Sequence, residues 1–229
     1  MSTTLADRAG VDALIESRLG SIAQQIPGAT AVLRRHKLDF CCGGDATLAD
    51  AARERGDDAA KIAGELRALA PLPADAPEEA EALIDHILER YHETHRRELP
   101  ELIFMARKVE EVHAGHAELP KGLSLLLEHI AEAIEEHMQK EERILFPMIR
   151  AGLGRAAIRP IAVMRHEHVE HGERLRQLEE LTRDHTPPAD ACTTWRALYA
   201  GTHKLVDDVM QHIHLENNVL FPQFAPDGN

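Results

Sequence analysis

The stretch HMQKEERILFP at residues 137–147 returns in altered form as HIHLENNVLFP at residues 212–222. Both stretches read His-x3-Glu-x3-Leu-Phe-Pro, and the second begins 75 positions after the first. A histidine and a glutamate four residues apart lie on one face of a helix, with their Cβ atoms about 5–6 Å apart. The repeat therefore predicts two helices of the same build, each presenting an imidazole beside a carboxylate.

In both helices the histidine and the glutamate fall inside an apolar stripe that recurs every three or four residues. The first stripe contains Leu123, Leu127, Ile130, Ile134, His137, Glu141, Ile144 and Met148. The second contains Leu198, Thr202, Leu205, Val209, His212, Glu216 and Val219. Such a stripe faces the core of a helical bundle. Because an ionised carboxylate is costly to bury without a partner, both glutamates need partners in that core.

Two further segments complete the pattern with histidines of their own. The stripe in residues 79–113 contains Ile84, Leu88, His92, His95, Leu99, Leu102, Ala106 and Val109. The stripe in residues 156–184 contains Ile161, Met164, His168, His171, Leu175 and Leu178. Both include His-x2-His-x3-Leu, 76 positions apart. The four segments therefore indicate a tandem duplication of a two-helix unit.

Short connections between four helical patterns predict an all-α fold, an up-down-up-down four-helix bundle. The four patterns cover residues 79–113, 121–150, 156–184 and 190–223. Pro100 is expected to kink the first helix and not to end it, because the apolar period resumes beyond it. Three prolines within residues 71–77 indicate a linker. We expect a small helical domain at 1–70, a linker at 71–78 and the bundle at 79–229.

Composition narrows the classes of partner. The 229 residues are 44% hydrophobic but only 3% aromatic, and the formal net charge is −13. That charge argues against non-specific nucleic-acid binding and against docking on an anionic membrane. The N-terminus lacks a secretory signal pattern, and no apolar run approaches the length of a membrane span. Three cysteines fit a reducing compartment, so a cytoplasmic protein is expected. The sequence leaves open whether it forms a homodimer.

Six residues are the predicted metal ligands, chosen by stripe and repeat: His92, His137, Glu141, His168, His212 and Glu216. Four imidazoles and two carboxylates suit two metal ions with bridging glutamates, and favour iron or manganese over Mg²⁺ or Ca²⁺. Zinc stays open. So does a metal-free core of Glu–His hydrogen bonds, which explains one pair easily and its duplicate poorly. His95 and His171 are assigned to the outer shell or an access route. The other histidines, His214 among them, are interpreted as solvated or outer-shell side chains.

The segment LDFCCGG places Cys41 and Cys42 next to each other before a Gly43-Gly44 turn. Adjacent thiols chelate one ion poorly, so a structural zinc site is not expected. A turn exposes thiols, and its backbone N–H groups could lower a thiol pKa. Thiol chemistry, persulfide formation and transient metal transfer are therefore weighed against an inert pair.

FCCGG near the N-terminus, followed by RYH, HMQKEERILFPMI and HIHLENNVLFP, resembles the family of di-iron iron–sulfur cluster repair proteins (RIC, or YtfE-like). The resemblance implies a hemerythrin-like bundle holding two non-haem iron ions bridged by oxo and carboxylate groups. By position, the family's ligands fall on the same six residues and its paired cysteines on Cys41 and Cys42. It also implies damaged iron–sulfur proteins as partners, with NO or O₂ as small ligands.

The leading functional hypothesis is repair of iron–sulfur clusters damaged by nitrosative or oxidative stress. In it, the di-iron centre supplies iron, and Cys41 and Cys42 assist the transfer. One alternative is an enzyme that reduces nitric oxide, or acts as an oxidase, at the di-iron site. Another is a hemerythrin-like module that senses O₂ or NO. The sequence does not decide whether the protein is an enzyme.

Overall fold

A computed structural model describes residues 5–26, 29–69 and 79–224. Within these ranges every regular element is helical, and the one β-type contact is an isolated bridge between Arg18 and Thr47. The predicted all-α class is therefore confirmed. None of the described helices is long and apolar enough to cross a lipid bilayer. The predicted linker, 71–78, lies outside the described residues, so the domain boundaries stay a prediction.

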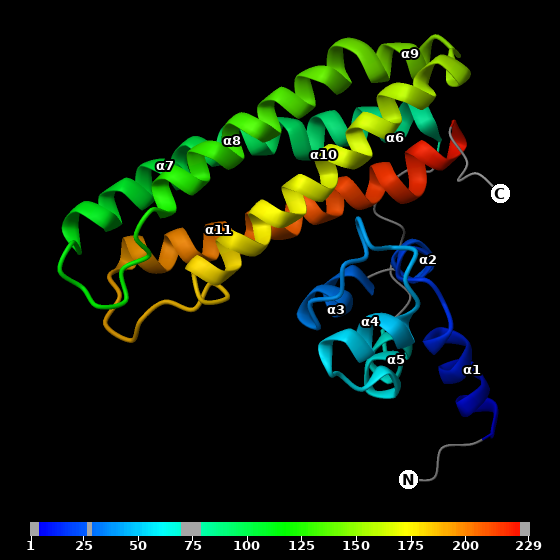
Figure 1. Cartoon of the computed structure of the whole chain (residues 1–229), viewed down its shortest axis with the longest axis horizontal. Coiled ribbons are helices and arrows are strands. Elements are labelled where there is room, and N and C mark those ends of the chain that lie inside the picture. Colours follow the sequence, from blue (N-terminus) through cyan, green and yellow to red (C-terminus); the bar gives the residue numbers. More distant parts are fainter. Residues whose placement is uncertain (1–4, 27–28, 70–78, 225–229) are drawn as a thin grey trace.

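Four helical rods form the bundle (Figure 1). The first is α6 (Ala80–Ile87), a π-helical turn η1 (Leu88–His92) and α7 (Glu93–Val112). The second is α8 (Leu123–Lys140), a π-helical turn η2 (Glu141–Leu145) and α9 (Phe146–Arg150). The third is α10 (Gly154–Leu181) alone. The fourth is α11 (Thr193–Leu215), a π-helical turn η3 (Glu216–Leu220) and the 3₁₀ turn η4 (Phe221–Gln223).

The rods are connected in up-down-up-down order. α7 packs against α8 and α11, and α10 packs against the same two helices, so sequence neighbours are also spatial neighbours. α7 continues through Pro100, as the apolar period predicted. This arrangement brings the middles of all four rods together around one axis.

Five short helices precede the bundle: α1 (Leu5–Ile15), α2 (Leu19–Gln25), α3 (Ala29–Arg35), α4 (Leu48–Arg55) and α5 (Ala59–Arg67). The hydroxyl of Thr47 accepts a hydrogen bond from the Asp50 N–H and caps α4. The group lies beside the end of the bundle where α11 leads into η3, and α2 contacts η3 there (Figure 1).

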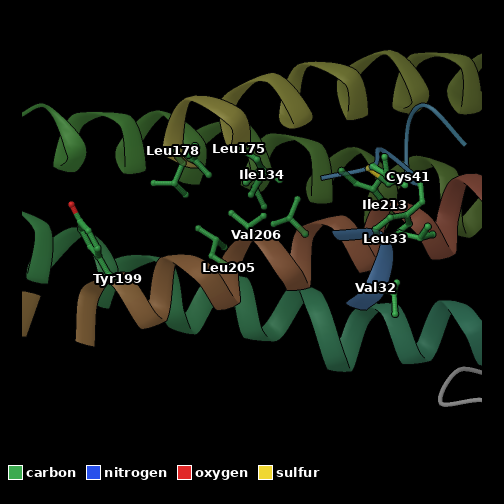
Figure 2. Close-up of a cluster of buried hydrophobic side chains, with 14 of the residues drawn as sticks. Val32, Leu33, Cys41, Ile134, Leu175, Leu178, Tyr199, Leu205, Val206 and Ile213 are labelled. Carbon is green, nitrogen blue, oxygen red and sulfur yellow. The ribbon is translucent and has the colours of Figure 1, made fainter. Parts of the chain in front are cut away.

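The apolar core is divided into two clusters. The larger one joins the N-terminal helices to the bundle, and Figure 2 shows Cys41 beside Leu33 of α3 and Ile213 of α11. The smaller one fills the end of the bundle formed by α6, α9 and η4, around Leu145 and Phe221. Each rod passes from one cluster to the other at the level of its histidine and glutamate side chains. A polar layer therefore separates two hydrophobic regions within one bundle.

The π-helical turns correct part of the predicted core. Ile144 was placed in the stripe, but it is 52% exposed, and Leu145 and Phe146 are buried instead. In η2 the Phe146 N–H bonds to the Glu141 carbonyl five residues back, which inserts one extra residue into the turn. Everything after the turn is shifted by one position. The same shift places Leu220 in the core where Val219 was predicted.

The third rod supports this explanation, because α10 has no π-helical turn. Its whole predicted stripe is buried: Ile161, Met164, His168, His171, Leu175 and Leu178. Pro147 and Pro222 follow η2 and η3 and lack an N–H group, so neither could extend a regular ladder. The change in register therefore occurs only in rods that contain a π-helical turn.

Substitution at Gly201 tests the close contact between α7 and α11. A Cβ at Gly201 would lie 2.5 Å from Leu102 Cδ2, so Gly201→Val should lower the free energy of unfolding by about 1–3 kcal/mol. Gly172→Ala in α10 is the matched control, because its Cβ would meet no atom closer than 3.8 Å. That change should raise stability by about 0.5–1 kcal/mol through helix propensity alone. Urea denaturation measures both, and equal effects would contradict the close contact.

Candidate metal centre

The six predicted ligand residues meet at the middle of the bundle and form a closed ring of contacts. Each glutamate faces two histidines: Glu141 lies 3.3 Å from His137 and 3.4 Å from His92. Glu216 lies 3.1 Å from His168 and 3.2 Å from His212. The ring closes through Nε2–Nε2 contacts of 3.3 Å between His92 and His212, and 3.0 Å between His137 and His168.

The ring divides into two sets of ligand atoms. One set combines His92 and His212, and the other combines His137 and His168. Each set also takes one oxygen from Glu141 and one from Glu216, and the four atoms of a set lie within 4.8 Å of one another. Each carboxylate therefore faces both sets, which is the arrangement that a bridging carboxylate requires.

The ring fits bound cations better than a metal-free hydrogen-bond network. All six side chains are at most 4% exposed. Both oxygens of Glu141 and Oε2 of Glu216 are buried without a hydrogen-bond donor in acceptable geometry. Buried carboxylates without donors are costly, and imidazole nitrogens with carboxylate oxygens are a donor set that suits iron or manganese. Metal binding by these residues remains a prediction that this geometry supports.

Electrostatics in the ring point the same way. Burial and repulsion from Glu216 oppose ionisation of Glu141, yet the imidazoles of His137 and His92 leave its pKa below the usual value. Burial likewise opposes protonation of His137, but the Glu141 carboxylate raises its pKa to about 10. The two carboxylates thus keep their negative charge only with positive charge beside them. A metal cation supplies that charge directly.

Three of the four histidines are held from behind through Nδ1. The partners are Glu142 for His92 at 2.7 Å, Glu167 for His137 at 2.9 Å and Asn217 for His168 at 2.9 Å. These contacts orient the rings so that Nε2 points into the centre. The sequence interpretation did not single out these partners. The signal available was their position, directly beside a predicted ligand in the chain.

His95 and His171 border the centre but belong to neither ligand set. The ring of His95 lies 5.6 Å from that of His212, and the ring of His171 lies 5.0 Å from that of His137. Burial and the neighbouring histidine lower the pKa of His95, and burial with repulsion from His137 lowers the pKa of His171 to about 2. Both rings therefore stay neutral, as outer-shell groups would.

The structure revises the interpretation of two other features. His214 is not solvated: it is 2% exposed and packs edge-on against Phe40, 5.5 Å between ring centroids. Cys41 is buried, while Cys42 is half-buried, with 3.6 Å between their sulfurs. The hydrogen bond with Cys42 and burial raise the pKa of the Cys41 thiol, which is opposite to the lowering that the N–H groups of a turn could produce. The thiols and Asp39 form a further group that could hold a cation.

Comparison with known proteins adds two kinds of finding. Residues 83–224 match the model of the hemerythrin HHE cation binding domain, and residues 15–70 match a domain of unknown function (DUF542). The chain is 50% identical over 215 residues to the iron-sulfur cluster repair protein YtfE of Musicola paradisiaca, covering 91% of this chain and 96% of that protein. It is 51% identical over 208 residues to the YtfE protein of Cronobacter sakazakii, covering 90% and 94%. The YtfE protein of an Escherichia coli O17:K52:H18 strain is 50% identical over the same length.

Metal removal tests the ring. Chelation should lower the melting temperature of the parent protein, since an ion at 100 times its Kd stabilises the fold by about 2.7 kcal/mol. The Glu141→Gln, Glu216→Gln double variant should show no such change, because its amides carry no charge for a cation to balance. Glu136→Gln, on the exposed side of α8, is the control that keeps the response. A parent protein that melts identically with and without chelator would exclude the metal centre.

Proposed function

The chain belongs to the hemerythrin-like iron–sulfur cluster repair family, and on that basis we propose that it repairs damaged iron–sulfur clusters by supplying iron. The observation that carries the proposal is the buried ring in which two glutamates each face two histidine pairs. We propose that the ring holds two non-haem iron ions, one per set of four ligand atoms, with Glu141 and Glu216 bridging them. An oxo bridge between the ions belongs to the same proposal.

The donor set suits iron that must be released. Each set offers two imidazole nitrogens and two carboxylate oxygens. Four protein atoms leave an iron ion with positions open to exchangeable ligands such as water, O₂ or NO. Both oxygens of each set come from glutamates shared with the other set, so loss of one ion leaves the other still held. Bound iron would supply redox chemistry and an exchangeable cation.

The chain's own residues hold and shield that cation. The Nδ1 partners Glu142, Glu167 and Asn217 fix three of the imidazoles, so the ligands need not reorganise when an ion enters or leaves. The neutral imidazoles of His95 and His171 lie 5.6 Å and 5.0 Å from the imidazoles of His212 and His137, and they add no charge beside the ions. A preformed site of this kind favours repeated loading and unloading.

Cys41 and Cys42 are proposed to assist the transfer of iron to the client protein. The loop that contains them lies against η3, where the Cys41 carbonyl accepts a hydrogen bond of 2.9 Å from Asn217. The half-buried Cys42 is the more accessible thiol, and Asp39 adds an oxygen within reach of both sulfurs. The clients are damaged iron–sulfur proteins, as the relatives' name indicates.

Replacing both thiols tests their part in repair. The Cys41→Ser, Cys42→Ser double variant should reactivate a [4Fe–4S] enzyme inactivated by nitric oxide severalfold more slowly than the parent protein. Its iron content and absorption spectrum should be unchanged, because neither cysteine belongs to the ring. Reactivation is measured as recovered client activity with iron supplied only by the repair protein.

Cys192→Ser is the matched control, because Cys192 precedes α11 and contacts His113, away from the N-terminal helices. It should repair at the parent rate. Parent-level repair by the double variant would remove the cysteines from the proposal and leave iron supply by the ring intact. Production of nitrous oxide from NO and a reductant at the repair rate would instead favour catalysis at the ring.

A further inference from the structure

The duplication of the bundle is broken at one position next to the ring. Counting from the repeated glutamates, Asn217 in η3 corresponds to Glu142 in η2. Both side chains make the same kind of contact with a ligand histidine: Glu142 Oε1 lies 2.7 Å from His92 Nδ1, and Asn217 Oδ1 lies 2.9 Å from His168 Nδ1. The chain thus uses a carboxylate in one repeat and an amide in the other for the same contact.

The amide makes a second contact that a carboxylate could not make. Asn217 Nδ2 donates to the carbonyl oxygen of Cys41 at 2.9 Å. A carboxylate only accepts hydrogen bonds, and only an amide side chain offers an oxygen and an N–H₂ group a short distance apart. Glu142 Oε1 also accepts a hydrogen bond of 2.8 Å from Arg96 Nη1. The two repeats therefore differ in what lies behind the ligand: a cation in one and the cysteine loop in the other.

The next residue repeats this division of roles. Asn218 donates to the Phe40 carbonyl at 3.4 Å and contacts His214, whereas its counterpart Arg143 is exposed. α2 and η3 approach so closely here that a Cβ at Gly20 would lie 2.6 Å from Asn218 Oδ1. η3 therefore presents two consecutive amides to the N-terminal helices.

We propose that Asn217 is a positioning residue that couples the orientation of His168 to the docking of the Cys41–Cys42 loop. With the loop docked, the Asn217 amide is held by His168 on one side and by the Cys41 carbonyl on the other. A displacement of either partner therefore changes the geometry of the contact with the other. The ion held by His137 and His168 is then the one whose binding depends on the loop. By linkage, loading that ion also strengthens loop docking. The inference rests on the proposed function only for the identity of the ion.

The test measures thiol reactivity in the full chain with and without metal, in a Cys192→Ser background so that only Cys41 and Cys42 report. Mn²⁺ is the probe, because it prefers carboxylate and imidazole ligands and binds thiols poorly. In the parent protein, Mn²⁺ should slow the reaction of the cysteines with Ellman's reagent by about fivefold or more. In Asn217→Asp the slowing should disappear, because aspartate can still accept from His168 but cannot donate to Cys41.

Three further variants separate positioning from general stability. Asn217→Ala loses both contacts, so its thiols should react faster and its affinity for Mn²⁺ should fall by about 10–100-fold. Asn218→Ala removes a loop contact without touching a ligand, and Glu142→Gln changes a ligand's partner without touching the loop. Both should retain slowing of the cysteines by Mn²⁺. Circular dichroism of each variant checks that its helices are kept.

Slowing by Mn²⁺ in Asn217→Asp equal to that of the parent would overturn the coupling. If Asn217→Ala does not fold, Asn217→Asp alone decides the question. If the parent protein binds neither iron nor Mn²⁺, the proposed function fails at the ring. Thiol reactivity without metal then still shows whether Asn217 docks the loop, so the two failures are distinguishable.

Discussion

The structure depends on two carboxylates that are buried in the middle of a helical bundle and kept ionised. Glu141 and Glu216 are fully buried, and each is flanked by two histidines at 3.1–3.4 Å. Apolar side chains at this level would give a more favourable free energy of folding, because burying an ionised carboxylate carries a large desolvation penalty that a leucine does not. The core is accordingly split into two hydrophobic clusters with the polar layer between them.

The π-helical turns begin or end at that polar layer. η2 starts at Glu141, η3 starts at Glu216 and η1 ends at His92. Each turn adds one residue, which rotates the following segment relative to the preceding one. The rod can therefore direct His and Glu side chains to the centre and still bury a different set of apolar residues beyond it. α10 contributes His168 to the ring without such a turn.

A duplicated unit gives two equivalent halves, and the N-terminal helices make them different. They pack against η3, and the amides of Asn217 and Asn218 face them there. The equivalent residues of the first repeat are charged: Glu142 pairs with Arg96, and Arg143 is exposed to solvent. A symmetric ring of ligands thus lies in asymmetric surroundings, and only one histidine pair is linked to the cysteine loop.

The sequence alone determined the helical class and the residues of the ring, because the helical period and the duplication are local properties of the chain. His168 was preferred to His166 by register alone, and the structure places it at the centre. The stripe beyond Glu141 could not be read correctly, since a π-helical turn changes the register without a clear mark in composition. The burial of Cys41 and His214 and the double contact of Asn217 were decided only by tertiary structure. They depend on how the N-terminal helices dock against η3, and that contact joins residues more than 170 positions apart, which no local pattern encodes.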